Sequence, residues 1–194
     1  MRKSSKVRNT KETEIVCRLN LDGTGKCSVK TGIRFLDHMI ELFSKHSLID
    51  LELSCKGDID VDDHHTIEDV AITLGQCIDE ALGDRTGINR YGTAYVPMDE
   101  SLARCVVDLS GRSYTVFKAE FTRSKVNDLS TEMVEHFFKS LGENIKANIH
   151  IELLYGKNNH HRIESIFKSF AIALREAVTR NPRIKGVQST KGRL

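Results

Sequence analysis

The chain has 194 residues, of which 39% are hydrophobic and 29% are charged, and its formal net charge is +2. This length suits one globular domain, or two small domains that share a core. The weak net charge, the absence of tryptophan and the lack of an interleaved aromatic and basic run argue against a nucleic-acid-binding protein. The sequence contains no apolar stretch of about 18 residues and no signal peptide, so we predict a soluble, cytoplasmic protein without a membrane partner.

The five cysteines limit the kind of metal site that the chain can form. They include no CxxC pair, their number is odd, and most of them lie in alternating apolar segments. This pattern is typical of buried, reduced thiols rather than of disulfides or thiolate metal sites. Any metal bound here is therefore expected to be bound through nitrogen and oxygen.

The first predicted elements are two strands, because residues 12–21 and 25–32 alternate apolar and polar side chains. We predict that they form a β-hairpin whose turn lies at Asp22-Gly23. The elements that follow are a short amphipathic helix, an alternating strand and a longer helix, at residues 33–46, 48–57 and 64–82.

The same order of elements then occurs a second time. Glycines and charges replace the apolar pattern at residues 83–92, where we place the boundary between a first half, 1–88, and a second half, 89–194. Residues 100–121 predict another hairpin, with its turn at Ser110-Gly111. A short helix, a strand and a longer helix follow, at residues 130–143, 147–156 and 160–178. The second half ends in a loose basic tail, which we expect to become ordered when phosphate binds.

The two long helices repeat each other at a distance of 96 residues. Seven apolar positions with helical spacing keep their phase: Ile67, Val70, Ala71, Leu74, Ile78, Ala81 and Leu82 correspond to Ile163, Ile166, Phe167, Phe170, Leu174, Ala177 and Val178. Each helix is preceded by a pair whose side-chain oxygens suit an N-cap, Asp62-Asp63 or Asn158-Asn159. The sequence therefore predicts an α+β fold with an internal duplication, in which two adjacent histidines begin the long helix of each half.

Each long helix also carries a glutamate four residues after its first histidine. His64 and Glu68 therefore share one helix face, as do His160 and Glu164, and this spacing occurs in helical metal sites. In the first turn the helix dipole favours the neutral imidazole that binds a metal. The short helices add two further histidines, each preceded by an acid that is either a hydrogen-bond acceptor for the imidazole or a plain surface carboxylate, in the pairs Asp37-His38 and Glu135-His136.

The second histidine of each pair, His65 or His161, points about 100° away from the first and is free to serve another ion. The internal symmetry suggests an exchange of ligands that gives each of two ions three imidazoles and one carboxylate. One predicted set is His64, Glu68, His136 and His161, and the other is His160, Glu164, His38 and His65. Each set leaves about two octahedral positions for substrate and water.

A solvated contact is the ordinary explanation of a single His–Glu pair, and we assign solvated surface positions to His46 and His150, which have no repeat partner. Six of the eight histidines follow the duplication, which favours a metal site instead. The ligand types admit manganese, iron or zinc, and octahedral nitrogen and oxygen ligands favour manganese.

Seven motifs together closely resemble the imidazoleglycerol-phosphate dehydratase family, a lyase of histidine biosynthesis. They are FLDHM, DDHHTIEDVAITLG, GINRYG, DLSGR, VEHFFKSL, NNHHRIESIFKSFAIALREA and STKG. The resemblance runs from about residue 6 to the last residue. It implies two β3αβα halves, each a small mixed sheet with helices packed on one face. It further implies two Mn²⁺ ions per subunit and a homo-oligomer of 24 subunits, with metal sites between neighbouring subunits.

The resemblance also implies the reaction, which converts imidazole glycerol phosphate into imidazole-acetol phosphate with loss of water. A carboxylate must remove a proton from carbon in such a reaction. The matching residue is Glu12, with Glu14 as a local competitor that is expected on the same face of the same strand. The positions that match phosphate-binding residues are Arg90, Arg112, Lys168, Ser189 and Lys191.

The chain departs from the family pattern at Ser47, where glycine is usual, and at Leu42, where glutamine is frequent. Neither residue is a predicted ligand, so these differences concern details of the pocket. Two other classes remain open from the residues alone. A two-metal hydrolase suits the nitrogen and oxygen ligands, although the predicted sets offer few carboxylates to bridge the ions. A metal-storage protein explains the histidines but not the basic positions.

Overall fold

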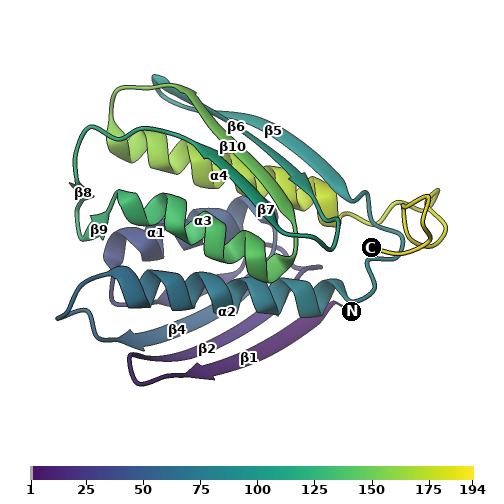
Figure 1. Cartoon of the computed structure of the whole chain (residues 1–194), viewed down its shortest axis with the longest axis horizontal. Coiled ribbons are helices and arrows are strands. Elements are labelled where there is room, and N and C mark those ends of the chain that lie inside the picture. The colour runs from purple at the N-terminus through teal and green to yellow at the C-terminus, as the bar shows by residue number, and fades with distance from the viewer. Residues whose placement is uncertain (1) are drawn as a thin grey trace.

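The computed structural model describes residues 2–194 as two four-stranded sheets with four helices packed between them (Figure 1). The helices are α1 (Arg34–Ser47), α2 (His64–Leu82), α3 (Glu132–Ile145) and α4 (Asn159–Val178). The strands of the first sheet are β1 (Lys3–Asn9), β2 (Thr13–Asn20), β3 (Cys27–Lys30) and β4 (Asp50–Gly57). The strands of the second sheet are β5 (Tyr91–Met98), β6 (Ser101–Asp108), β7 (Tyr114–Lys118) and β10 (Asn148–Tyr155), and a small ribbon joins β8 (Lys125–Val126) to β9 (Leu129–Ser130).

The two sheets have equivalent strand orders, β1-β2-β4-β3 and β5-β6-β10-β7. In each sheet three neighbouring strands are antiparallel, and the last strand runs parallel to its neighbour. The helices cover only the inner face of each sheet (Figure 1). The expected α+β fold with an internal duplication into two mixed β3αβα sheets is therefore confirmed. The division at residues 88 and 89 falls between α2 and β5 and stays a prediction.

Both predicted hairpins are wrong in their pairing. The chain does reverse direction between β2 and β3 and between β6 and β7, but β4 and β10 lie between these strands and pair with both. A connection of six residues links β2 to β3, and it is long enough to pass the end of the intervening strand, because next-nearest strands are only about 9.6 Å apart. The turn residues therefore predicted correctly where the chain reverses direction, but they did not predict which strands pair with each other.

The true hairpins are formed by β1 with β2 and by β5 with β6, and our reading of the alternation did not identify β1 or β5. Strand β1 is an edge strand with the sequence KSSKVRN, so it shows no apolar alternation that would predict it. The turn between β5 and β6 is only two residues, Asp99 and Glu100, and that between β1 and β2 carries Glu12.

The long helices begin close to where they were predicted, α2 at His64 and α4 at Asn159, directly before His160. Asn158 is the N-cap of α4, and its Oδ1 accepts a hydrogen bond from the amide of His160 at 2.9 Å. In α2 the corresponding amide of His64 donates to Asp62 Oδ1 at 2.8 Å. The Asp63 carboxylate instead accepts hydrogen bonds from the amide and the hydroxyl of Ser130, which belongs to the second half.

The two halves share one interior. Helix α2 packs on α3, and α1 packs on α4, so each helix pair joins the halves. Phe43 of α1 stacks on Phe170 of α4 at 5.7 Å between ring centroids, and Phe138, Phe167 and Phe170 form a buried aromatic group. Each half thus covers the other's helical layer, which stabilises both by apolar burial. Within residues 2–194, none of the helices combines the length and apolar character needed to cross a bilayer.

Candidate active site

The first cluster of predicted ligands forms where α2 meets α3. Glu68 lies between two imidazoles, with its Oε1 3.1 Å from His136 Nε2 and its Oε2 3.8 Å from His64 Nε2. One ligand atom from each of the three residues lies within 4.8 Å of the others. The i, i+4 spacing on α2 supplies two of these groups, and the packing of α3 against α2 supplies the third.

The second cluster forms in the same way where α1 meets α4. Glu164 Oε2 lies 3.1 Å from His160 Nε2 and 3.6 Å from His38 Nε2, and these three residues also form a compact group. Burial tends to raise the pKa of the Glu164 carboxyl, but a hydrogen bond and the positive charge from Lys168 outweigh it and keep this pKa below its usual value. Lys168 Nζ lies 2.5 Å from Glu164 Oε1. Each cluster therefore takes one histidine, His136 or His38, from a short helix of the opposite half of the chain.

The two remaining predicted ligands lie outside these clusters. His65 Nδ1 lies 3.0 Å from Asp58 Oδ2, and His161 Nδ1 lies 2.7 Å from Glu100 Oε2. These hydrogen bonds raise the pKa of both imidazoles. The structure thus brings together three of the four ligands of each predicted set within one chain, while the fourth faces a carboxylate elsewhere.

The residues of the clusters fit a divalent cation. His136 Nε2 is buried and, among the described residues, has no hydrogen bond of good geometry although Glu68 is near. Such an orphaned acceptor, beside a second imidazole and a carboxylate, suits a cation with borderline nitrogen and oxygen preferences. Asp37 and Glu135 do not act as acceptors for the neighbouring imidazoles. Asp37 accepts hydrogen bonds from Thr31, and Glu135 pairs with Lys139, so that possible role was wrong.

The two candidate bases occupy different positions. Glu12 lies in the turn just before β2, with Oε1 3.7 Å from His65 Nε2. Glu14 lies on β2 itself, on the exposed outer face of the sheet, where it lines a groove with Val7 and Lys56. The expectation that both carboxylates share one strand face was therefore wrong, because β2 begins only at Thr13.

Four of the five predicted phosphate-binding residues surround one cavity of about 560 Å³ near the C-terminus. These are Arg90, Arg112, Ser189 and Lys191. The Arg90 guanidinium makes two hydrogen bonds with Asp108, at 2.7 and 3.1 Å, and donates a third to the carbonyl of Gln188, at 2.8 Å. It therefore ties the tail to the second sheet.

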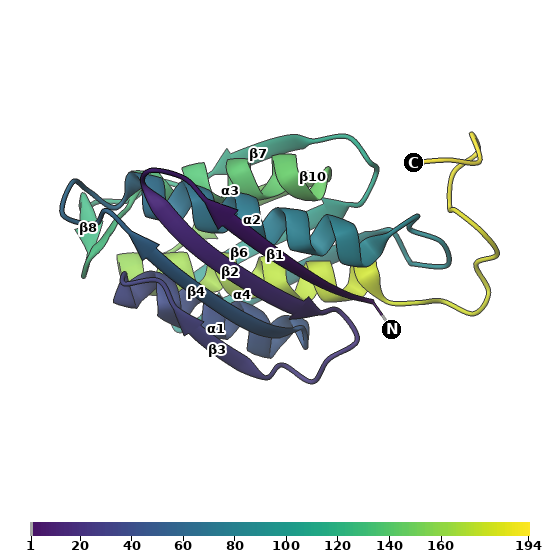
Figure 2. The same ribbon diagram turned by 90° about the horizontal axis from the view of Figure 1, so that it is seen from below.

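The basic cavity and the histidine clusters lie at opposite ends of the chain. Helices α2 and α4 begin at the left of Figure 1 with their histidines, and the C-terminal segment lies at the right, beyond the ends of both helices (Figures 1 and 2). The fifth predicted residue, Lys168, lies beside the second histidine cluster rather than at the cavity. One chain therefore does not bring the predicted metal ligands together with the four predicted phosphate ligands that surround the cavity.

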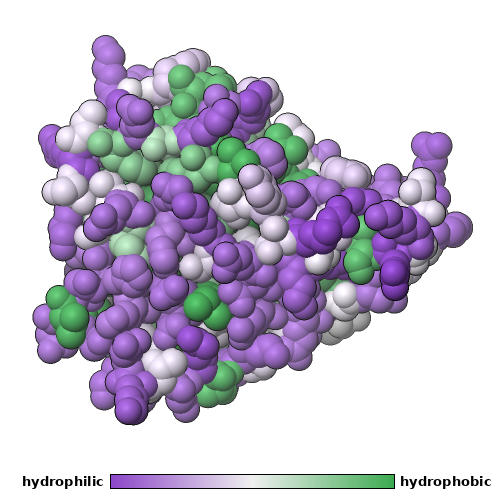
Figure 3. Space-filling model, viewed as in Figure 1, coloured by the Kyte–Doolittle hydropathy of each residue, from purple (hydrophilic) through white to green (hydrophobic). Residues whose placement is uncertain are grey.

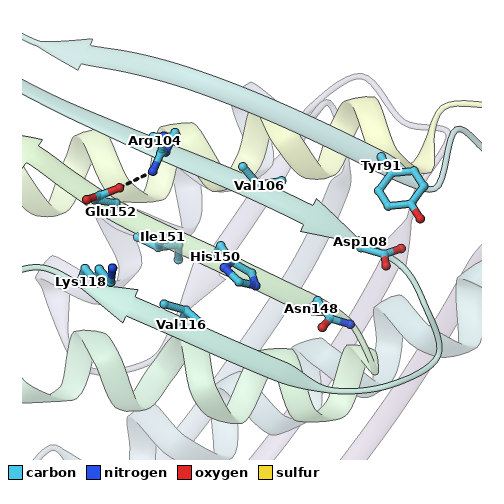
Figure 4. A pocket seen from close by; sticks show the side chains of 10 residues that line it. All are labelled: Tyr91, Arg104, Val106, Asp108, Val116, Lys118, Asn148, His150, Ile151 and Glu152. Atoms are coloured by element: carbon cyan, nitrogen blue, oxygen red, sulfur yellow. Dashed lines mark hydrogen bonds and ion pairs between the residues drawn. The ribbon is translucent and has the colours of Figure 1, made fainter.

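Another cavity, of about 410 Å³, lies on the outer face of the second sheet and is lined by none of the predicted site residues. Val106, Val116 and His150 form its middle, and an ion pair between Arg104 and Glu152 lies at one end of it (Figure 4). Most of the face seen in Figure 3 is hydrophilic. Apolar side chains gather in the upper part of that view, where the second sheet lies.

Reasoning from the sequence missed the carboxylates that contact His65 and His161, which are Asp58 and Glu100. A signal for Glu100 was present, since Glu12 and Glu100 each stand one residue before the inner strand of a hairpin, β2 or β6. Glu12 and Glu100 are 88 residues apart, whereas the long helices repeat at 96 residues. An alignment of the two halves at 96 residues therefore does not pair these glutamates.

Comparisons with known proteins point to one family. The model of the family described as imidazoleglycerol-phosphate dehydratase matches residues 31–174. The chain is 62% identical over 193 residues to the imidazoleglycerol-phosphate dehydratase of Chloroherpeton thalassium, with 98% of this chain and 97% of that protein covered. It is 58% identical over 192 residues to that of Listeria welshimeri, with 99% of each covered.

Two solved structures share the fold. The imidazoleglycerol-phosphate dehydratase of Staphylococcus aureus is 41% identical with a TM-score of 0.84, and the match covers 92% of this chain and 99% of that one. The enzyme of Pyrococcus furiosus, solved in complex with (S)-C348, is 32% identical with a TM-score of 0.83, covering 97% and 100%. The chain therefore belongs to the imidazoleglycerol-phosphate dehydratase family, the enzymes of the dehydration step of histidine biosynthesis.

Proposed function

We propose that this chain converts imidazole glycerol phosphate into imidazole-acetol phosphate with the help of two Mn²⁺ ions per subunit. The observation that carries the proposal is the pair of compact histidine and glutamate clusters at the beginnings of two repeated helices. His64, Glu68 and His136 would hold one ion, and His160, Glu164 and His38 the other. His65 and His161 would each complete a coordination sphere. A bound divalent ion supplies Lewis acidity, which makes the imidazole ring of the substrate more reactive.

Glu12 is the carboxylate that we assign to proton transfer. Its side chain is half exposed, it makes no side-chain hydrogen bond among the described residues, and it lies next to His65. A carboxylate with a free lone pair at a site of ligand binding is able to accept a proton from carbon. Glu14 points to the outer face of the first sheet, away from both clusters, and is the weaker candidate.

We further propose that each complete site forms between chains of a homo-oligomer of 24 subunits. Helix α2 has 19 residues and is about 28 Å long, several times the length of a three-carbon phosphate tail. One substrate therefore does not reach from the clusters to the basic cavity of the same chain. A neighbouring chain would supply Arg90, Arg112, Ser189 and Lys191, and Lys168 beside the clusters would meet the same phosphate from the other side.

One assay tests the reaction against its alternatives. The purified protein is incubated with imidazole glycerol phosphate after chelation, and again after Mn²⁺ is restored, and both the ketone product and free phosphate are measured. We expect ketone only in the presence of metal. Released phosphate would instead support a two-metal hydrolase, and metal binding without either product would support a storage protein. Full activity after exhaustive chelation would contradict the metal requirement.

The assignment of the base makes a separate prediction. Glu12→Gln removes the proton acceptor but keeps the size of the side chain, so we expect kcat to fall about 100-fold or more. Metal content per chain should not change, because Glu12 belongs to neither cluster. Glu14→Gln is the matched control and should keep activity within about twofold. A larger loss from Glu14→Gln than from Glu12→Gln would reverse the assignment.

A further inference from the structure

The turn that carries Glu12 is anchored by a buried carboxylate on α2. Asp69 is 5% exposed and follows the cluster residue Glu68 directly in the chain. Its Oδ2 accepts a hydrogen bond from Thr13 Oγ1 at 2.5 Å, and its Oδ1 lies 2.8 Å from Arg8 Nε and 2.7 Å from Arg8 Nη2. One side chain therefore holds the end of β1 and the start of β2, on the two sides of the turn.

A second layer of hydrogen bonds fixes the backbone of the turn itself. Thr10 Oγ1 accepts the amide N–H groups of Glu12 and Thr13, at 3.1 and 2.9 Å, and the Thr10 amide donates to the carbonyl of Thr13 at 2.9 Å. The Glu12 carbonyl also accepts from the amide of Asp58 at 3.1 Å. The backbone of Glu12 is thus fully engaged while its carboxylate is left free.

The second half offers an internal comparison, because Glu100 occupies the position equivalent to Glu12. Its carboxylate accepts hydrogen bonds from the amides of Lys157 and Asn158, at 2.9 and 2.7 Å, and contacts His161 Nδ1 at 2.7 Å. The position equivalent to Asp69 is Ser165, whose hydroxyl donates only to the carbonyl of Arg162 in its own helix. In the second half, the Glu100 carboxylate is held by hydrogen bonds and no carboxylate stands at the position of Asp69. In the first half, the Glu12 carboxylate has no such hydrogen bonds among the described residues, and Asp69 holds the turn instead.

We propose that Arg8, Asp69 and Thr13 form a positioning network for Glu12, which holds the β1–β2 turn so that this carboxylate stands beside His65 without a partner of its own. The network acts through Glu12 and touches neither substrate nor metal. The proposal rests on the assignment of Glu12 as the proton-transferring group. A buried, charge-assisted set of hydrogen bonds keeps a defined geometry, and small displacements of a reacting group cost large factors in rate.

The test uses Arg8→Gln in the full assembly, because the Arg8 side chain is 33% exposed and does not belong to the apolar core. We expect kcat to fall about tenfold to 100-fold, with KM and metal content within about twofold of the unchanged protein. Arg8→Lys, which keeps one charged contact with Asp69, should recover part of the loss. Arg18→Gln is the matched control, since it breaks an exposed pair with Glu52 on the same sheet, and should leave kcat unchanged.

Three results would overturn the network. The first is a kcat for Arg8→Gln equal to that for Arg18→Gln. The second is a rise in KM as large as the fall in kcat, and the third is a fall in metal content as large as the fall in kcat. Glu12→Gln separates the two proposals. If Glu12→Gln keeps its activity, the assignment of the base fails. If Glu12→Gln is inactive while Arg8→Gln is fully active, only the positioning network fails.

Discussion

An imidazole binds a metal through an unprotonated nitrogen, so the neighbours of each histidine decide which nitrogen is available. The Glu100 carboxylate has four polar contacts, with two backbone amides, the Ser101 hydroxyl and His161, and the hydrogen bonds from the amides and His161 hold the pKa of its carboxyl well below the usual range. It is therefore an acceptor, and His161 donates through Nδ1 and presents Nε2. Asp58 does the same for His65, with one oxygen that is buried and has no hydrogen-bond partner among the described residues.

The pair of Glu100 and His161 makes the stability of the metal-free protein depend on pH. The pKa of His161 is raised from 6.5, so its stabilising contribution is complete below 6.5 and is lost as the pH rises through the folded value. The pKa of Glu100 is lowered from 4.5, so its contribution is present above 4.5 and is lost as the pH falls. We therefore expect Glu100→Gln to lower the Tm of the chelated protein more at pH 5.5 than at pH 8. An equal or smaller loss at pH 5.5 would show that the pair contributes nothing.

At the scale of the element, the beginning of a long helix organises each cluster. The cap fixes the first turn, the first turn carries the two histidines, and the glutamate lies one turn further on. The caps differ in detail, since Asp62 acts in α2 and Asn158 in α4, yet both accept the amide of the first histidine. The short helices then add one histidine each, through packing that crosses from one half to the other.

Asn158→Ala removes the acceptor of the His160 amide and leaves that N–H without a protein partner. We expect a loss of about 1 kcal/mol in the free energy of unfolding, which lowers Tm by roughly 2–4 °C for a chain of this size. Asn158→Ser keeps a capping oxygen and is the control, with most of the stability retained. Thermal unfolding of the metal-free protein measures both. Equal Tm values for the alanine and serine variants would show that the cap does not stabilise α4.

At the scale of the whole molecule, the separation between the histidine clusters and the basic cavity leads us to expect that chains exchange parts of a site. The β1–β2 turn, which carries Glu12, lies at the end where α2 begins, and the C-terminal segment, which carries Lys191, lies at the other end (Figure 1). A single chain that acted alone would need both groups at one end. We therefore expect assembly to be required for activity, in addition to any effect on stability.

Mixed assemblies test this expectation. Glu12→Gln and Lys191→Ala should each be inactive, because one lacks the base and the other a phosphate contact. Chains of the two variants, dissociated and reassembled together in equal amounts, should regain about one quarter of the unmodified activity, since random assortment gives some sites an intact residue from each chain. Assemblies of each variant alone are the controls. A mixture that stays inactive, with its size unchanged, would place the complete site within one chain.

The sequence by itself determined the features that depend on neighbours along the chain. Helical periodicity, capping residues and strand alternation predicted the four helices and the strands β2, β3 and β4 with their counterparts, and the repeat identified six candidate ligands that do converge. These are local properties, because a helix face or a strand face is set by residues a few positions apart.

Only the tertiary structure decided which elements are partners. The insertion of β4 between β2 and β3, the meeting of α1 with α4, and the anchoring of the Glu12 turn by Asp69 all join residues that are distant in sequence. Such contacts depend on how sheets and helices pack to bury apolar surface, and no local pattern records that choice. For the same reason the distance between the histidine clusters and the basic tail became apparent only in the folded chain.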